Sequence, residues 1–177
     1  MTEDNLNKIK STQVLELIRV AHEFCIYTEE IENKDIMDLL SFYQKVLPLL
    51  YLKGSLMPDI KVSDTSFNER FVTEEHWEKI YMSLKTKLGD DDFFWHADEN
   101  NELIKLSVAD YMADIYQDMK DFVVLFQKDR LAAKENAIFS IKKYHAIHWG
   151  PRLTDILPVF HKLLFAKEIA LNEETDI

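Results

Sequence analysis

Apolar residues recur at three- and four-residue steps through most of the chain, which is the spacing of one face of an α-helix. This pattern predicts helices over about 11–31, 35–53, 73–89, 107–128, 131–149 and 151–170. Alternation of apolar and polar residues is not sustained anywhere, and no Asn-Gly or Asp-Gly pair marks a hairpin turn. We therefore expect helices throughout and no strands.

Residues that start and stop helices separate these stretches. Thr73 is a good N-cap, and Gly54 and Gly89 are natural stops. Gly150 followed by Pro151 indicates one helix ending and the next beginning. Two segments, 55–71 and 90–102, are predicted to be loops, and Pro48 and Pro158 should kink or interrupt their helices. The prediction is an all-α, single-domain helical bundle of about six helices covering 1–177, with its core at about 10–170 and a polar tail at 171–177.

Composition narrows the class of protein. The chain has 177 residues, 47% of them hydrophobic, and its 21 basic and 32 acidic residues give a net charge of −11. That charge argues against binding to nucleic acid or to an anionic membrane surface. The densest apolar run, 46–52, is far shorter than the ~20 residues of a membrane helix. The N-terminus lacks an apolar signal segment, and the lone Cys25 sits in a helical apolar pattern, so we expect a cytoplasmic protein with a buried thiol.

An ordered row of aspartates stands out in the helix predicted over 107–128. Asp110, Asp114, Asp118 and Asp121 follow one another at steps of four, four and three. They fall within a sector of roughly 80° that flanks the apolar side of the helix. Because Mg²⁺ and Mn²⁺ prefer oxygen ligands, Asp110 and Asp114 are candidate metal ligands. The alternative is a solvated acidic face.

The segment KKYHAIHWGPRLTD, 142–155, is the second candidate. His145 and His148 continue the apolar stripe of their helix, so they should point toward neighbouring helices. Two imidazoles at this spacing can share a metal ion, or one can act as an acid or base near neutral pH. The alternative is that both are hydrogen-bonded packing residues. Arg152 could hold an anionic ligand or form an ordinary salt bridge.

Several specific signatures are absent. The chain has no Glu-x-x-His pair of the di-iron bundles, no His-Glu-x-x-His zinc motif, no P-loop and no Gly-x-Gly-x-x-Gly run. The segment 90–102 lacks the central glycine of an EF-hand loop. No complete catalytic motif remains, so we do not expect an enzyme on this ground.

Three segments, taken together, resemble an uncharacterised bacterial family. They are RFVTEEHWEKIYMSLKTKLGDDDFFW, SVADYMADIYQDMKDF and HAIHWGPRLTDILPVFHKLL. The resemblance covers about 10–167 and is to domain of unknown function 5063, which is frequent in Bacteroidetes. Its most specific pieces are 110–118 and 148–150. Members often carry a histidine where this chain has Arg152, and that departure weakens a histidine metal site at the turn. The resemblance implies a helical, bacterial, cytoplasmic protein and supplies no activity.

Two functions remain open. The first is a non-catalytic module that binds a protein partner or self-associates, which the missing catalytic motifs and the 12% aromatic content favour. The second is a divalent-metal-assisted hydrolase or a bundle that binds a small ligand. Its site would lie where the aspartates meet the histidines, and its candidate residues are Asp110, Asp114, Asp118, His145, His148 and Arg152.

Overall fold

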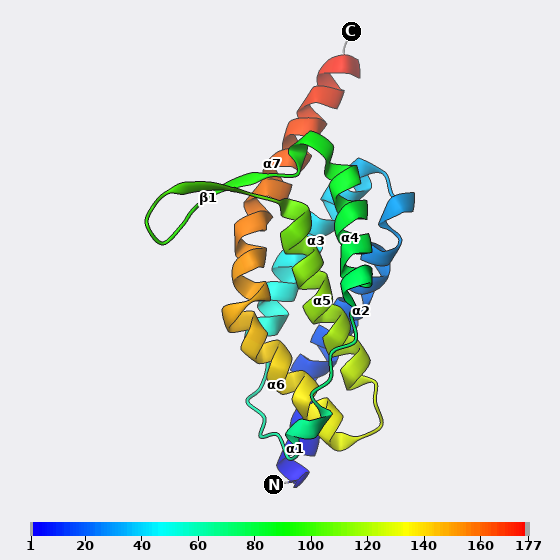
Figure 1. Ribbon diagram of the computed structural model, residues 1–177. Helices are drawn as coiled ribbons and strands as arrows, with labels where there is room; N and C mark the ends of the chain where they lie inside the picture. The colour runs from blue at the N-terminus through cyan, green and yellow to red at the C-terminus, as the bar shows by residue number, and fades with distance from the viewer. Residues whose placement is uncertain (1, 176–177) are drawn as a thin grey trace.

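The computed structural model describes residues 2–175. This part of the chain forms seven α-helices and one short hairpin (Figure 1). The elements are α1 (Thr2–Ile9), α2 (Thr12–Glu29), α3 (Ile36–Ser55), α4 (Glu74–Leu88), β1 (Phe94–Ala97), β2 (Leu103–Leu106), α5 (Val108–Phe126), α6 (Leu131–Ile147) and α7 (Trp149–Thr175). The predicted all-α bundle is confirmed, with one helix more than the six expected.

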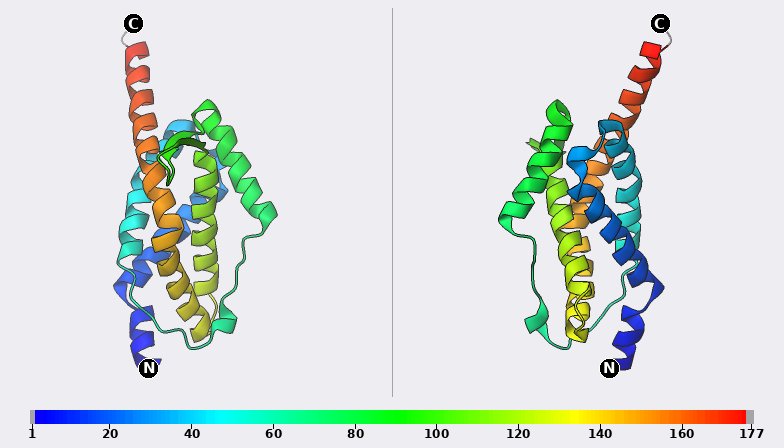
Figure 2. Two further views of the ribbon diagram at one scale, coloured as in Figure 1. Left: turned by 60° about the vertical axis from the view of Figure 1, so that its left-hand side comes forward. Right: turned by 90° about the vertical axis from the view of Figure 1, so that its right-hand side faces the viewer.

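Helix α5 is the central element of the bundle. It packs against α2, α4, α6 and α7, while α3 closes the far side against α2 and α7. Figure 2 shows these helices running along one long axis, with the last turns of α7 reaching beyond the rest. Cys25 is buried in this core, as predicted, and burial raises the pKa of its thiol. None of the described helices is long and apolar enough to cross a membrane.

Side-chain caps fix several helix starts. Thr73 Oγ1 accepts a hydrogen bond from the His76 amide at 3.2 Å, which confirms the predicted cap of α4. Asp35 caps α3, and Ser107 caps α5 at the Asp110 amide. Helices α3 and α7 continue through Pro48 and Pro158 without ending. Helices α3, α4 and α5 therefore begin where a short polar side chain takes up one of their first free amides.

The helices extend closer to both ends of the chain than the predicted bounds of about 11 and 170. The polar N-terminus forms α1, which packs on α2 and α6 through the buried Ile9. The expected polar tail is helical through Thr175, because α7 continues without a break, and residues 176–177 lie outside the described part.

The segment 90–102, predicted to be a loop, instead contributes β1 and the turn of a hairpin. Strands β1 and β2 are antiparallel, with Phe94 opposite Leu106 and Ala97 opposite Leu103. The turn is a three-residue loop in which Asn101 takes a left-handed φ of 60°, and the Asp98 carboxylate accepts from the amides of Asn100 and Glu102. Four-residue strands are too short to show clear alternation. Asn101, and not a glycine, takes the left-handed conformation in this turn.

Two glycines serve close packing rather than helix ends. Gly54 lies inside α3, where an added Cβ would overlap the Trp149 ring and come within 2.8 Å of His145 Cδ2. Gly150 lies in the first turn of α7, directly against the His145 carbonyl. The reversal between α6 and α7 is made by His148 alone, whose amide donates to the Tyr144 carbonyl at 2.8 Å. The prediction that these glycines act as helix stops was therefore wrong.

Candidate functional site

The aspartate row of α5 faces the segment 56–73, which joins α3 to α4 and which we call the strap. The strap runs along the lower part of the bundle, across α5 and α6, with one short 3₁₀ turn at Thr65–Phe67. Because it has little regular structure, its backbone groups need partners from elsewhere. Buried side chains of α5 and α6 supply them.

Asp121 and Asp118 hold the C-terminal part of the strap. Asp121 Oδ1 accepts hydrogen bonds from the Phe71 amide at 2.7 Å and the Val72 amide at 2.9 Å. Asp121 Oδ2 faces Arg70 Nε at 2.5 Å as an ion pair outside hydrogen-bond geometry. Arg70 Nη2 also lies 3.3 Å from Asp118 Oδ1. Burial raises the pKa of Asp121, although both amides and Arg70 act in the opposite direction.

His148 joins Asp118 to Asp114. Its Nδ1 lies 2.5 Å from Asp118 Oδ2, and its Nε2 lies 3.8 Å from Asp114 Oδ2. Asp118 is only 2% exposed, so water competes little for its contacts with Arg70 and His148. The reversal between α6 and α7 thus places one imidazole between two carboxylates.

Asp114 is held from two further helices. The Trp77 indole N–H of α4 donates to Asp114 Oδ1 at 3.0 Å, and Arg152 Nε of α7 donates to Asp114 Oδ2 at 2.8 Å. The same guanidinium donates to the His148 carbonyl at 3.2 Å and lies over the Tyr111 ring. Arg152 therefore forms the salt bridge that was the simpler of its two predicted roles.

The remaining two candidates lie at the margin of this row. Asp110 is half-buried, and its carboxylate has no hydrogen bond or ion pair within the described residues. Burial, together with the nearby Asp114, raises its pKa. His145 lies apart, with its ring centroid 4.7 Å from that of Trp149 and 4.8 Å from that of Tyr51. Burial lowers the pKa of His145 and favours the neutral ring. His145 is thus the packing residue that we had weighed against a metal ligand.

A second group on α6 holds the N-terminal part of the strap. Glu135, which is 1% exposed, accepts from Asn5 Nδ2 at 2.6 Å and from the Ser63 amide and hydroxyl at 2.8 and 2.5 Å. Asn136 donates to the Asp64 carbonyl at 2.7 Å, and Asn5 also donates to the Lys61 carbonyl. Burial alone would raise the pKa of Glu135, but these hydrogen bonds lower it.

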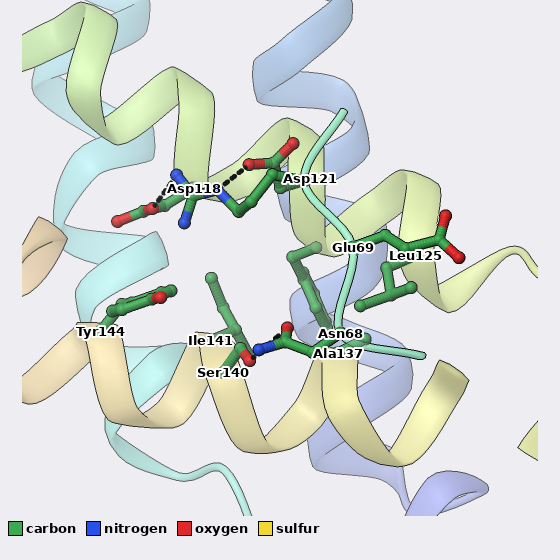
Figure 3. A pocket seen from close by; sticks show the side chains of 11 residues that line it. Asn68, Glu69, Asp118, Asp121, Leu125, Ala137, Ser140, Ile141 and Tyr144 are labelled. Carbon is green, nitrogen blue, oxygen red and sulfur yellow. Dashed lines mark hydrogen bonds and ion pairs between the residues drawn. The ribbon is translucent and has the colours of Figure 1, made fainter. Parts of the chain in front are cut away.

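Nearly all the buried polar side chains serve the strap. In the described part of the chain these side chains are Asn5, Thr28, Asp118, Asp121, Glu135 and Asn136, and every one except Thr28 contacts the strap. A narrow cleft lies between the strap and helices α5 and α6. Figure 3 shows Asp118 and Asp121 with their ion pairs at its upper wall, Tyr144 and Ile141 below, and Glu69 turned away.

Sequence reasoning missed Arg70 and Trp77 as partners of the row. The sequence around Arg70 does not indicate that Arg70 is a partner of the row. A segment without regular structure has no periodic pattern that would predict which side chains point inward. Glu135 did leave a signal, since it stands three residues before Ile138 on the apolar stripe of α6. A charged residue at a buried helical position indicates a partner in the core.

Three of the four carboxylates of this row, those of Asp114, Asp118 and Asp121, are already matched by donors. No group of three or more His, Cys, Asp and Glu residues within 2–175 is arranged to hold a metal ion. Asp114 and Asp118 face Arg152, Arg70 and His148 instead. A divalent ion at Asp110 and Asp114 stays a prediction that no described group supports.

A different surface carries exposed apolar side chains. The hairpin projects sideways from the helices (Figure 1), and its Trp95 and Leu103 are 60% and 68% exposed, with Phe93 and Ile104 also exposed. A groove with about 910 Å³ of empty space separates it from α7, and it is lined by Phe93, Phe94, Trp95, Asp155, Pro158, Val159, Lys162 and Leu163. His96 lies 3.5 Å from Asp155, and the Phe94 ring packs on Tyr111, so the base of the hairpin is anchored.

The class of protein is thus a helical bundle with an internally clamped strap and a projecting hairpin. The chain belongs to the family described as Domain of unknown function (DUF5063), whose model matches residues 8–166. It is similar to the crystal structure of protein BF1032 from Bacteroides fragilis, with 29% identity and a TM-score of 0.80 over 88% of this chain and 94% of that one. A search of the curated proteins gave no match.

Proposed function

We propose that this protein is a non-catalytic interaction module whose binding surface is the hairpin together with the facing side of α7. We call this the hairpin–α7 surface and define it by Phe93, Trp95, Leu103, Ile104, Pro158 and Leu163. Contiguous exposed apolar groups flanking a groove are typical of protein-binding sites. Tryptophan is among the residues that most often dominate binding energy.

The carrying observation is the placement of Trp95 and Leu103. Cross-strand partners lie on the same face of a sheet, and the register pairs Trp95 with Lys105 and Ala97 with Leu103. These four side chains therefore share one face. The other face carries Phe94, His96, Ile104 and Leu106, of which Phe94 and His96 anchor the hairpin to the bundle. Neither Trp95 nor Leu103 is needed to bury the hairpin against its own chain. Exposing these two apolar side chains to water is unfavourable, and a partner that covers them removes that unfavourable free energy.

The aspartate row of α5 supports the same proposal, because its side chains pair with His148 and two arginines of the same chain. A catalytic acid, base or metal ligand must reach a substrate, whereas Asp114, Asp118 and His148 face one another and two arginines. Asp121 is committed to the strap backbone. We therefore assign the row to holding α4, α5, α7 and the strap together.

The experiment is site-specific photo-crosslinking in cells that make the protein naturally. A photoreactive phenylalanine analogue at position 103 should give one discrete protein adduct, and the same analogue at the exposed Glu23 of α2 should not. Trp95→Ser should reduce the adduct from position 103, because it removes the neighbouring apolar anchor. A chain that gives no adduct from position 103, while remaining folded, would overturn the proposed function.

A further inference from the structure

The outer edge of β2 is open. In the described part of the chain, β2 pairs with β1 on one side only. The Asp98 amide donates to the Glu102 carbonyl at 2.9 Å, and bonded and non-bonded pairs alternate along an antiparallel ladder. It follows from this alternation that the main-chain groups of Ile104 bond to His96 of β1. The main-chain groups of Leu103 and Lys105 then point away from β1, toward the open edge. Such an edge is a template for another strand.

We propose that this edge pairs antiparallel with β2 of a second copy of the chain, giving a four-stranded sheet across a twofold axis. The inference rests on the proposed function, since it names the partner of the hairpin–α7 surface. A twofold axis perpendicular to the sheet keeps each side chain on its own face, so the pairing must be centred on a residue rather than between two. Centring it on Lys105 would set like charges opposite each other.

Centring the pairing on Ile104 satisfies both the backbone and the side chains. Ile104 then lies opposite the Ile104 of the second copy as a non-bonded pair, where side chains approach most closely. Leu103 lies opposite Lys105 of the second copy, and their outward N–H and C=O groups exchange hydrogen bonds twice. Ile104, an exposed residue of the hairpin–α7 surface, therefore lies opposite itself, while Leu103 meets Lys105 of the second copy.

Charge favours the same register. Glu102 comes opposite Leu106 of the second copy, so the acidic tip, with Asp98 and Glu99, reaches the base of the other hairpin. That base contains a hollow of about 850 Å³, lined by Tyr81, Lys85, Gly89, Asp90, Asp92, Phe93, Lys105, Leu106 and Ser107. Asp92 is occupied by hydrogen bonds from Ser107 Oγ and the Ala109 amide. The other charged groups of the hollow are Asp90, Lys85, which contacts the Tyr81 hydroxyl, and Lys105, which lies over the Phe93 ring.

A second copy fits this edge better than an unrelated strand for a geometric reason. Under the twofold axis each acidic tip meets a lysine-bearing base, so the complementarity occurs twice. The projecting hairpins also hold two bodies of charge −11 apart. An unrelated strand would need to reproduce the apolar centre and the basic end together.

The first test is disulfide trapping. Cys25 is buried, so Ile104→Cys adds one reactive thiol, and mild oxidation of the purified protein should link two copies. We expect linkage about tenfold faster than for Glu99→Cys at the tip, because pairing raises the effective concentration of the two thiols. Equal rates, confirmed at two protein concentrations, would overturn the proposed pairing.

Leu103→Pro gives a matched test of the backbone bonds. The Leu103 amide points outward, so proline leaves the hairpin ladder intact and removes one donor to the second copy. In the Ile104→Cys background it should abolish fast linkage, whereas Leu103→Thr, which keeps the amide, should retain it. Loss in both variants, or in neither, would contradict the pairing.

The photo-crosslinked adduct from position 103 separates the two proposals. An adduct of twice 20.9 kDa containing this sequence alone supports the second copy. An adduct with a different protein overturns the pairing and leaves the interaction function standing. No adduct overturns both.

Discussion

Replacing Glu135 by alanine should detach the N-terminal part of the strap. The substitution removes the acceptors for Asn5 Nδ2 and for the amide and hydroxyl of Ser63. Hydrogen bonds to a charged group contribute about 1.5–3 kcal/mol each. Ser63 is exposed and can turn to water, whereas Asn5 is buried, so we expect a loss of about 3 kcal/mol rather than the full sum.

That loss should be visible in two assays. For a chain of this size it corresponds to a fall in Tm of roughly 6–12 °C by circular dichroism. Limited digestion with trypsin should show faster cleavage after Lys61, whose carbonyl bonds Asn5. Glu135→Gln, which keeps shape and one acceptor, should fall between the wild type and Glu135→Ala. A Tm for Glu135→Ala within 2 °C of wild type, roughly 1 kcal/mol, would refute the reasoning.

The pH dependence gives an independent check on Glu135. Its pKa in the folded protein is lowered, so its contribution is present above the pKa of a free carboxyl and is lost as pH falls through the folded value. The stability difference between wild type and Glu135→Gln should therefore shrink below about pH 4. A difference that stays constant to lower pH would show that the carboxylate charge has no part in the clamp.

Three further predictions concern other parts of the bundle. Gly54→Ala should lower stability by about 1–3 kcal/mol in urea unfolding, because the new Cβ overlaps the Trp149 ring; an unchanged midpoint would contradict that close approach. Asp110→Asn should stabilise the protein at neutral pH by less than about 1 kcal/mol. The gain should vanish as pH falls through the raised pKa of Asp110, because the native carboxyl is then protonated and uncharged. A gain that persists in acid would exclude the charge of Asp110 as its cause. Millimolar Mg²⁺ or Mn²⁺ should leave the Tm unchanged, and a shift that Asp114→Ala removes would revive the metal site.

Much of the helical architecture could be predicted because the sequence signals of a helix lie within the helix itself. The 3.6-residue period, the Thr73 cap and the inward direction of His148 all follow from neighbours in sequence. The hairpin could not be predicted in this way, since strands of four residues carry too little pattern and Asn101 supplies its turn. The hairpin on which the proposed function rests could therefore not be predicted from this short, polar segment.

The candidate site was half predictable for a related reason. Spacing placed Asp114 and Asp118 on one side of α5, and the reversal brought His148 and Arg152 to them. The sequence could not supply Arg70, which arrives from an irregular strap 48 residues before Asp118. With Arg70 and Trp77 in place, a row that read as a cation site becomes a set of internal ion pairs. Residue type and spacing defined the chemistry available, and tertiary contacts decided its use.

The most direct test of the account compares the photo-crosslinking yield from position 103 in two variants, Arg70→Ala and Trp95→Ser, both held below their melting temperatures. We expect Arg70→Ala to keep the adduct although its Tm falls, because Arg70 only ties the strap to Asp118 and Asp121. Trp95→Ser should keep its Tm and give a reduced adduct. The opposite pattern, with the adduct lost on breaking the polar row and kept on removing Trp95, would contradict the assignment of function to the hairpin–α7 surface.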